Sequence, residues 1–144
     1  MLTIQHLQKL FYAGTADERI AIDGVSLTLA PGDFAVVVGG NGAGKSTLLN
    51  MIAGELSSDA GVIRIDDHDI THLPTHQRAR YIARVFQDPA IGTAAALSIE
   101  ENLAVAAQRG ARRTFGCALS ASTRQDLQAR LASFGLGPGN PPQA

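Results

Sequence analysis

The sequence predicts an α/β fold built on a parallel sheet, and the order of three consecutive segments carries this prediction. Residues 33–38 read Asp-Phe-Ala-Val-Val-Val, an apolar run that is typical of a parallel strand buried on both faces. A glycine-rich loop follows, and residues 45–53 then carry apolar side chains at helical spacing, with Gly54 placed to end the helix. These helix-spaced side chains are Leu48, Leu49 and Ile52.

The glycine-rich loop matches a phosphate-binding pattern, which is a glycine, four residues, and then Gly-Lys-Ser or Gly-Lys-Thr. Glycines let backbone N–H groups surround an anion, and the N-terminus of the following helix adds a positive end at the same place. By this pattern Lys45 reaches the outer phosphates of a nucleotide, and the Ser46 hydroxyl binds Mg²⁺. The predicted nucleotide-binding residues are Gly39, Gly40, Asn41, Gly42, Ala43, Gly44, Lys45, Ser46 and Thr47.

Composition limits the other classes of function. The chain has 144 residues, of which 45% are apolar and 17% charged, as in one ordinary globular domain. Its net charge of −1 gives no electrostatic reason to expect a nucleic-acid partner. The single cysteine, Cys117, excludes an internal disulfide. No apolar run approaches the roughly 20 residues of a membrane helix, so the chain is not expected to span a bilayer by itself.

Alternating and helix-spaced apolar residues predict the remaining elements. Further strands are expected at residues 2–7, 20–30, 61–66 and 81–86. Further helices are expected at residues 74–80, 99–108 and 122–134. Ser98 and Glu101 form a capping-box pattern, which predicts where the second of these helices begins.

Several residues outside the loop give weaker signals. From the residues alone, Phe11 or Tyr12 could stack on an adenine ring or could pack on the edge of the sheet. Gln87 follows the predicted strand at residues 81–86, at the end of the strand where parallel sheets bind ligands. A charged surface is expected at Arg78, Arg80 and Arg84.

Two runs give the chain a family resemblance. Residues 39–50, Gly-Gly-Asn-Gly-Ala-Gly-Lys-Ser-Thr-Leu-Leu-Asn, and residues 85–89, Val-Phe-Gln-Asp-Pro, resemble motifs of the ATP-binding domain of ABC transporters. The resemblance covers residues 1–136 and implies a P-loop NTPase-type parallel-sheet core with an N-terminal antiparallel β-subdomain. Residues 137–144 are a Pro/Gly-rich tail that is expected to be disordered.

The resemblance also implies roles for residues that the pattern alone leaves open. Phe11, or failing it Tyr12, would be the aromatic residue that stacks on adenine. Gln87 would contact Mg²⁺ together with Ser46, and would sense the transmembrane partner. Lys45 and Gln87 would be the residues of this chain that take part in catalysis. The implied cofactors are therefore ATP and Mg²⁺.

The family resemblance further implies protein partners. A transmembrane permease subunit would contact residues 87–102, and a second ATP-binding subunit would form a dimer with the first. The protein would then be cytoplasmic and held on the inner face of the cell membrane by the permease. Phe11-x-x-Gly14-Thr15 and the Gly-Thr pair at residues 92–93 are similar to importer ATPases for amino-acid-like solutes.

The chain also departs from the family pattern. It carries no Leu-Ser-Gly-Gly-Gln signature, no apolar strand ending in Asp-Glu, and no switch histidine after such a strand. We therefore expect a truncated ATP-binding domain that holds the phosphate-binding loop and lacks the carboxylate that activates water. Two alternatives stay open, which are a non-catalytic nucleotide-binding protein and an unrelated P-loop kinase. The Gln-Asp-Pro run argues against the kinase.

We expect the 144-residue chain to bind Mg·ATP weakly and to hydrolyse it negligibly, because the sequence lacks the water-activating carboxylate. Release of inorganic phosphate by the purified chain measures this. Turnover at an ordinary enzymatic rate, on the order of 1 s⁻¹ or faster, would contradict the expectation.

Overall fold

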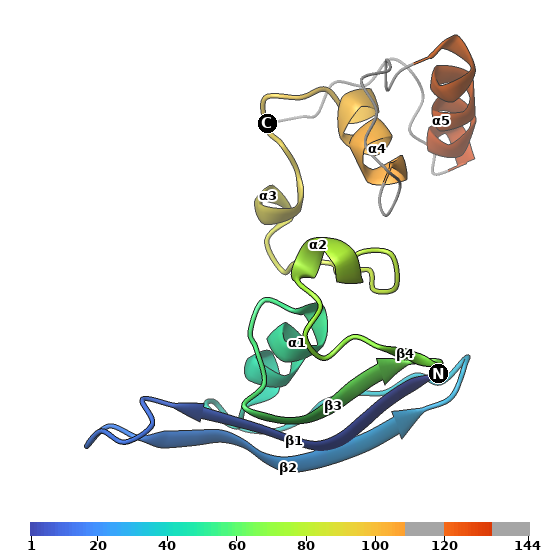
Figure 1. The fold of residues 1–144 in the computed structure, drawn as a ribbon. Helices are drawn as coiled ribbons and strands as arrows, with labels where there is room; N and C mark the ends of the chain where they lie inside the picture. The colour runs from blue at the N-terminus through green and yellow to red at the C-terminus, as the bar shows by residue number, and fades with distance from the viewer. Residues whose placement is uncertain (109–119, 134–144) are drawn as a thin grey trace. The chain divides into compact units, whose positions relative to one another are not determined.

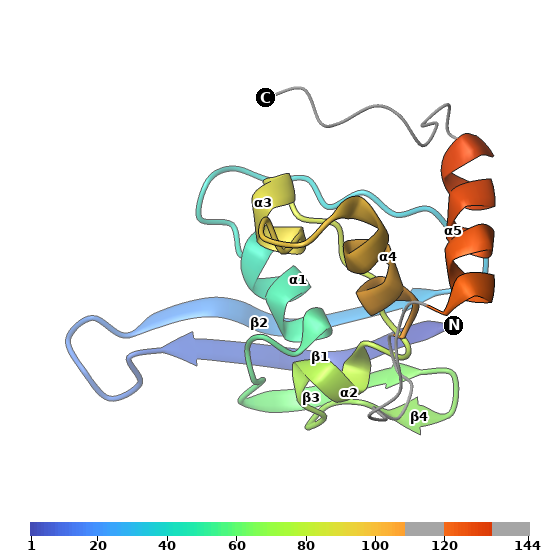
Figure 2. The same cartoon turned by 90° about the horizontal axis from the view of Figure 1, so that it is seen from above.

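The structure, a computed structural model, describes residues 1–108 and 120–133 and divides into two compact units, Met1–Ala83 and Arg84–Ala144. The first unit is built on a four-stranded sheet (Figure 1). Its strands are β1 (Leu2–Phe11), β2 (Arg19–Leu29), β3 (Ala60–Ile65) and β4 (His68–Asp69). The strand order is β2-β1-β3-β4, so β1 lies inside the sheet (Figure 2).

All strand pairs in this sheet are antiparallel, and β1 takes part in the two longest of these pairings, with β2 and with β3. The pairing with β2 runs from Leu2 opposite Leu29 to Phe11 opposite Arg19. On its other side β1 pairs with β3, where Leu2 lies opposite Ile65. The predicted N-terminal antiparallel β-subdomain is therefore confirmed, and the hairpin of β1 and β2 brings Phe11 and Arg19 to the same end.

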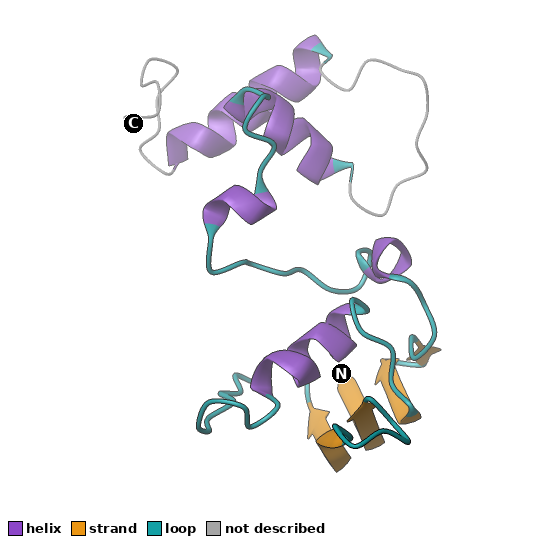
Figure 3. Ribbon diagram, turned by 90° about the vertical axis from the view of Figure 1, so that its left-hand side faces the viewer, coloured by secondary structure: helices purple, strands orange, loops and turns teal. Residues whose placement is uncertain are grey.

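Helix α1 (Lys45–Ala53) covers one face of this sheet, as Figures 1 and 3 show. The helix begins after Gly44 and ends at Gly54, as the sequence predicts. The buried side chains of α1 differ in part from the helix-spaced apolar residues of the sequence pattern. Met51, which is not in that set, is fully buried, whereas Leu49, which is in it, is 51% exposed. The buried core consists of Ile4, Leu7, Ile22, Leu48, Met51, Ile63 and Ile70.

Arg78 is buried, with 3% of its surface exposed, and so does not belong to the predicted charged surface. Its Nη1 donates to the carbonyl oxygens of Met51 at 2.6 Å and Ile52 at 2.9 Å. Its Nε donates to the Leu73 carbonyl at 2.7 Å, and its Nη2 donates to the Thr71 carbonyl at 2.7 Å. The last carbonyl oxygens of a helix have no N–H partner within the helix. Arg78 therefore supplies hydrogen-bond donors to carbonyl oxygens in the C-terminal turn of α1.

Two predicted strands, at residues 33–38 and 81–86, do not form. Phe34 is 91% exposed and Val38 is 87% exposed, where the sequence pattern predicts burial on both faces. Val85, in the second predicted strand, is 95% exposed. A strand needs neighbours that supply hydrogen bonds and apolar contacts. The described part of the chain contains no strand paired with either segment, so the parallel sheet is not built within it.

The other regular elements of the described chain are helices. The first unit ends with α2 (Thr75–Arg78), which is shorter than the predicted helix at residues 74–80. The second unit contains α3 (Pro89–Gly92), α4 (Ile99–Ala107) and α5 (Ala121–Ser133). No helix in residues 1–108 or 120–133 is long and apolar enough to cross a membrane.

The capping box at the start of α4 is confirmed. The Ser98 hydroxyl accepts a hydrogen bond from the Glu101 N–H at 3.3 Å, and the Glu101 carboxylate accepts one from the Ser98 N–H at 2.8 Å. The expectations for Cys117 and for the tail at residues 137–144 lie outside the described residues.

Replacing Arg78 by methionine, Arg78→Met, is expected to destabilise the fold by about 2–4 kcal/mol, because buried carbonyl oxygens lose their donors. Urea unfolding of the whole chain measures the change. Arg80→Met is the matched control, since Arg80 is exposed and its loss is expected to cost no more than about 0.5 kcal/mol. Equal unfolding midpoints for Arg78→Met and Arg80→Met would contradict the proposed role of Arg78.

Candidate nucleotide-binding site

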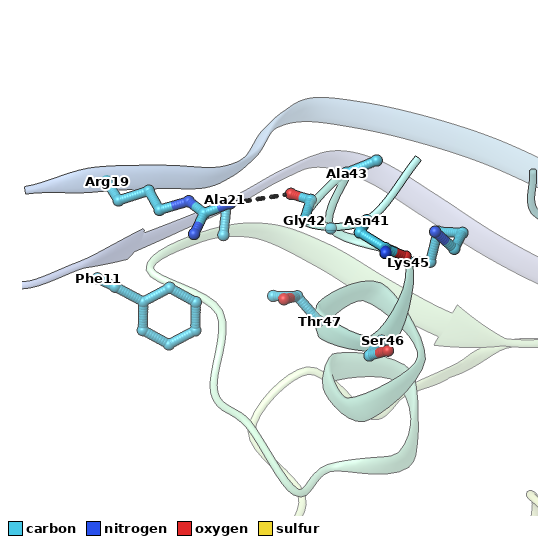
Figure 4. Close-up of a pocket in the computed structure, with 10 residues that line it drawn as sticks. Phe11, Arg19, Ala21, Asn41, Gly42, Ala43, Lys45, Ser46 and Thr47 are labelled. Carbon is cyan, nitrogen blue, oxygen red and sulfur yellow. Dashed lines mark hydrogen bonds between the residues drawn. The ribbon is translucent and has the colours of Figure 1, made fainter. Parts of the chain in front are cut away.

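The phosphate-binding loop borders a cavity of about 340 Å³ in the first unit, a size typical of small-molecule sites. The walls come from the loop and the start of α1 on one side, and from the ends of β1 and β2 on the other (Figure 4). The lining residues are Phe11, Arg19, Ala21, Asn41, Gly42, Ala43, Gly44, Lys45, Ser46 and Thr47. Folding therefore joins the predicted loop to a hairpin that precedes it in the sequence.

The N-terminus of α1 has the properties of an anion-binding site. Its N-cap residue, Gly44, offers no side-chain acceptor, and the first turn contains no acidic residue. The first N–H groups of a helix have no intrahelical acceptor, and the helix dipole places partial positive charge there. Gly44 has φ of 84°, and a Cβ at this position would lie 2.5 Å from the Ala21 carbonyl oxygen. Only glycine therefore allows the loop to approach β2 this closely.

Among the described residues that line the cavity, two are cations and none carries a carboxylate. The Lys45 ammonium donates to the carbonyl oxygens of Gly39 at 2.7 Å and Gly40 at 2.6 Å. Gly39 and Gly40 thus contribute by holding Lys45, although neither lines the cavity. The second cation, Arg19, was not among the predicted site residues. Its only sequence signal is its position where the second strand begins, across the hairpin from Phe11.

The structure distinguishes the two aromatic candidates by position. Phe11 lines the cavity, whereas Tyr12 is 70% exposed and does not line it. The Lys9 ammonium lies 5.8 Å from the centroid of the Phe11 ring and donates to the Asp59 carboxylate at 2.8 Å. Asp59 also accepts from the Leu10 N–H at 2.6 Å, and so fixes the end of β1 next to Phe11.

The residues predicted to bind the metal lie in different units. Ser46 lines the cavity from the first turn of α1. Gln87 belongs to the second unit, where its side chain is exposed. The role of Gln87 in binding Mg²⁺ therefore stays a prediction.

The family of the chain follows from comparison with known proteins. The model of the ABC transporter family matches residues 22–140, which is most of the chain, and the chain therefore belongs to this family. It is 37% identical over 110 residues to the tyrosine transport ATP-binding protein of Clostridioides difficile, in an alignment that covers 76% of this chain and 44% of the relative. It is 49% identical over 71 residues to the diacetylchitobiose uptake system ATP-binding protein of Streptomyces coelicolor, with 49% and 18% covered.

A solved structure shows the same fold. A dimeric bacterial ABC transporter cassette superimposes with a TM-score of 0.72 at 24% identity, covering 92% of this chain and 56% of that chain. The predicted α/β fold of an ABC cassette with an antiparallel β-subdomain is therefore confirmed, although its parallel sheet does not form within the described residues. The family match sets aside an unrelated P-loop kinase. The chain spans about half or less of the length of these proteins.

The Asp59 carboxylate makes the stability of the first unit depend on pH. Hydrogen bonds from the Lys9 ammonium and then from the Leu10 N–H hold the pKa of Asp59 below its ordinary value of 3.8. A carboxyl group whose pKa is lowered by folding stabilises the fold above its ordinary pKa, and this contribution is lost as pH falls through the lowered pKa.

The wild-type chain is therefore expected to exceed Asp59→Asn in urea midpoint at about pH 6, and the two midpoints are expected to converge as pH falls below 3.8 and through the lowered pKa of Asp59. Urea unfolding of both proteins across this range measures the difference. A difference that stays constant from about pH 6 to well below pH 3.8 would show that the charge of Asp59 is not responsible.

Proposed function

We propose that this chain supplies the nucleotide-binding part of the ATP-binding subunit of an ABC transporter, where binding of Mg·ATP powers solute transport. One observation carries the proposal. A single cavity has an aromatic ring, Phe11, on one wall and the uncapped N-terminus of α1 with Lys45 on the other. A flat apolar ring suits a nucleotide base, whereas backbone N–H groups and a cation suit its phosphates.

Each residue of the site would hold a different part of the nucleotide. Phe11 would stack on the adenine ring. The N–H groups at the start of α1 would bind phosphate oxygens, and Lys45 would exchange the Gly39 and Gly40 carbonyls for the outer phosphates. The Ser46 hydroxyl and Gln87 would bind Mg²⁺, which neutralises charge on the phosphates when it is bound.

The family also supports proposals about partners. We propose that a transmembrane permease contacts residues 87–102 and holds the subunit on the inner face of the membrane. We propose a second ATP-binding subunit as well, which agrees with the dimeric state of the superimposed cassette. The names of the relatives refer to tyrosine transport and to diacetylchitobiose uptake. The second name favours import, and the first name favours an amino-acid-like solute.

Lys45→Ala is expected to weaken Mg·ATP binding by about 10- to 100-fold, because charge-assisted hydrogen bonds to phosphate are lost. Isothermal titration calorimetry of ATP into the whole chain, with Mg²⁺ present, measures the change. Arg64→Ala is the matched control, since it removes an exposed cation of β3 that does not line the cavity.

Ser46→Ala separates metal binding from phosphate binding. This variant is expected to lose the increase in affinity that Mg²⁺ produces and to keep the affinity measured with excess chelator. The proposal fails if the wild-type chain binds no ATP, or if Lys45→Ala binds as tightly as Arg64→Ala.

A further inference from the structure

Arg19 enters the cavity from the hairpin, on the same side as Phe11 (Figure 4). It is the first residue of β2 and lies opposite Phe11 in the antiparallel pairing. Its Nη2 donates to the carbonyl oxygen of Gly42 at 3.1 Å, which holds the guanidinium against the phosphate-binding loop. The side chain therefore spans the cavity between the hairpin and the loop.

The charge of Arg19 has no acidic partner in the part of the chain that the structure describes. Within residues 1–108 and 120–133, no carboxylate forms an ion pair with Arg19, and its side chain is exposed. The observed bond goes to a neutral carbonyl and uses one of the five N–H donors of a guanidinium. The remaining donors and the full positive charge are available to an anion in the cavity.

Glycine suits residue 42 because the backbone there has a positive φ, and because a Cβ would force the end of the Arg19 side chain to shift. Gly42 has φ of 79°, and a Cβ there would lie 2.8 Å from Arg19 Nη2. Arg19 thus occupies a position like that of Lys45, because each cation donates to backbone carbonyls of the loop. Lys45 donates from the first turn of α1 to the Gly39 and Gly40 carbonyls, whereas Arg19 donates from the hairpin to the Gly42 carbonyl (Figure 4).

We propose that Arg19 is a second phosphate-binding cation, which binds the α-phosphate of the nucleotide and leaves the Gly42 carbonyl when it does so. This inference rests on the proposed function. With the base at Phe11 and the outer phosphates at Lys45, the α-phosphate is the phosphate nearest to the base, and Arg19 lies on the Phe11 side of the loop. A planar guanidinium can also bind two phosphate oxygens at once, which an ammonium group cannot match in geometry.

The test compares ATP and ADP binding by the whole chain, using calorimetry on the wild type, Arg19→Ala and Arg19→Gln. Arg19→Ala is expected to weaken both nucleotides by the same factor, about 5- to 20-fold, because both carry the α-phosphate. Arg19→Gln separates charge from structure, because its amide can still donate to the Gly42 carbonyl. We expect Arg19→Gln to lose nearly as much affinity as Arg19→Ala.

Controls separate this inference from the proposed function. Arg64→Ala lowers the net charge equally and is expected to change affinity by less than about twofold. Circular dichroism reports whether each variant keeps its fold. If Arg19→Ala unfolds, the nucleotide affinity of Arg19→Gln alone tests the inference.

Several results would overturn the inference. One is full affinity in Arg19→Gln, which would make Arg19 a structural tether, and another is a loss for ATP but not for ADP. In both cases Lys45-dependent ATP binding by the wild type would still support the proposed function. If the wild type shows no such binding, the proposed function fails, and the inference fails with it.

Discussion

The direction of α1 is the constraint on which the binding site of the first unit depends, because the uncapped N-terminus of this helix favours an anion. Its first N–H groups have no acceptor within the helix, and no side chain caps them. Packing sets the direction of the helix, because Leu48 and Met51 are buried against the sheet and Arg78 bonds the carbonyls of its last turn. The same packing that stabilises the unit therefore aims a positive helix end at the cavity.

The cavity also depends on contacts between distant segments. The hairpin of β1 and β2 supplies Phe11 and Arg19, whereas the loop and α1 supply Lys45 and Ser46. Asp59, near the start of β3, holds Lys9 and the backbone of Leu10 at the end of β1. Each wall is thus stabilised by residues that do not line the site, so a change in sheet pairing would alter the site without altering the motif.

The segment before the phosphate-binding loop shows that an apolar sequence pattern does not by itself form a strand. Residues 33–38 have the composition of a buried strand, yet Phe34 and Val38 are almost fully exposed. A parallel strand depends on partners elsewhere in the chain for hydrogen bonds and for burial of both faces. An exposed apolar segment of this kind is a surface that a further strand would bury, and until then it favours association with other chains.

The sequence by itself determined the features that depend on neighbouring residues, which are the phosphate-binding loop, the ends of α1 and the capping box of α4. Tertiary structure decided the features that depend on pairing and packing. Cross-strand register placed Arg19 opposite Phe11, and the end of β1 put Phe11 rather than Tyr12 at the cavity. Burial of Arg78 likewise required the carbonyls of α1 to be nearby. Spacing along the chain cannot report these contacts, because their partners are distant in sequence and meet only on folding.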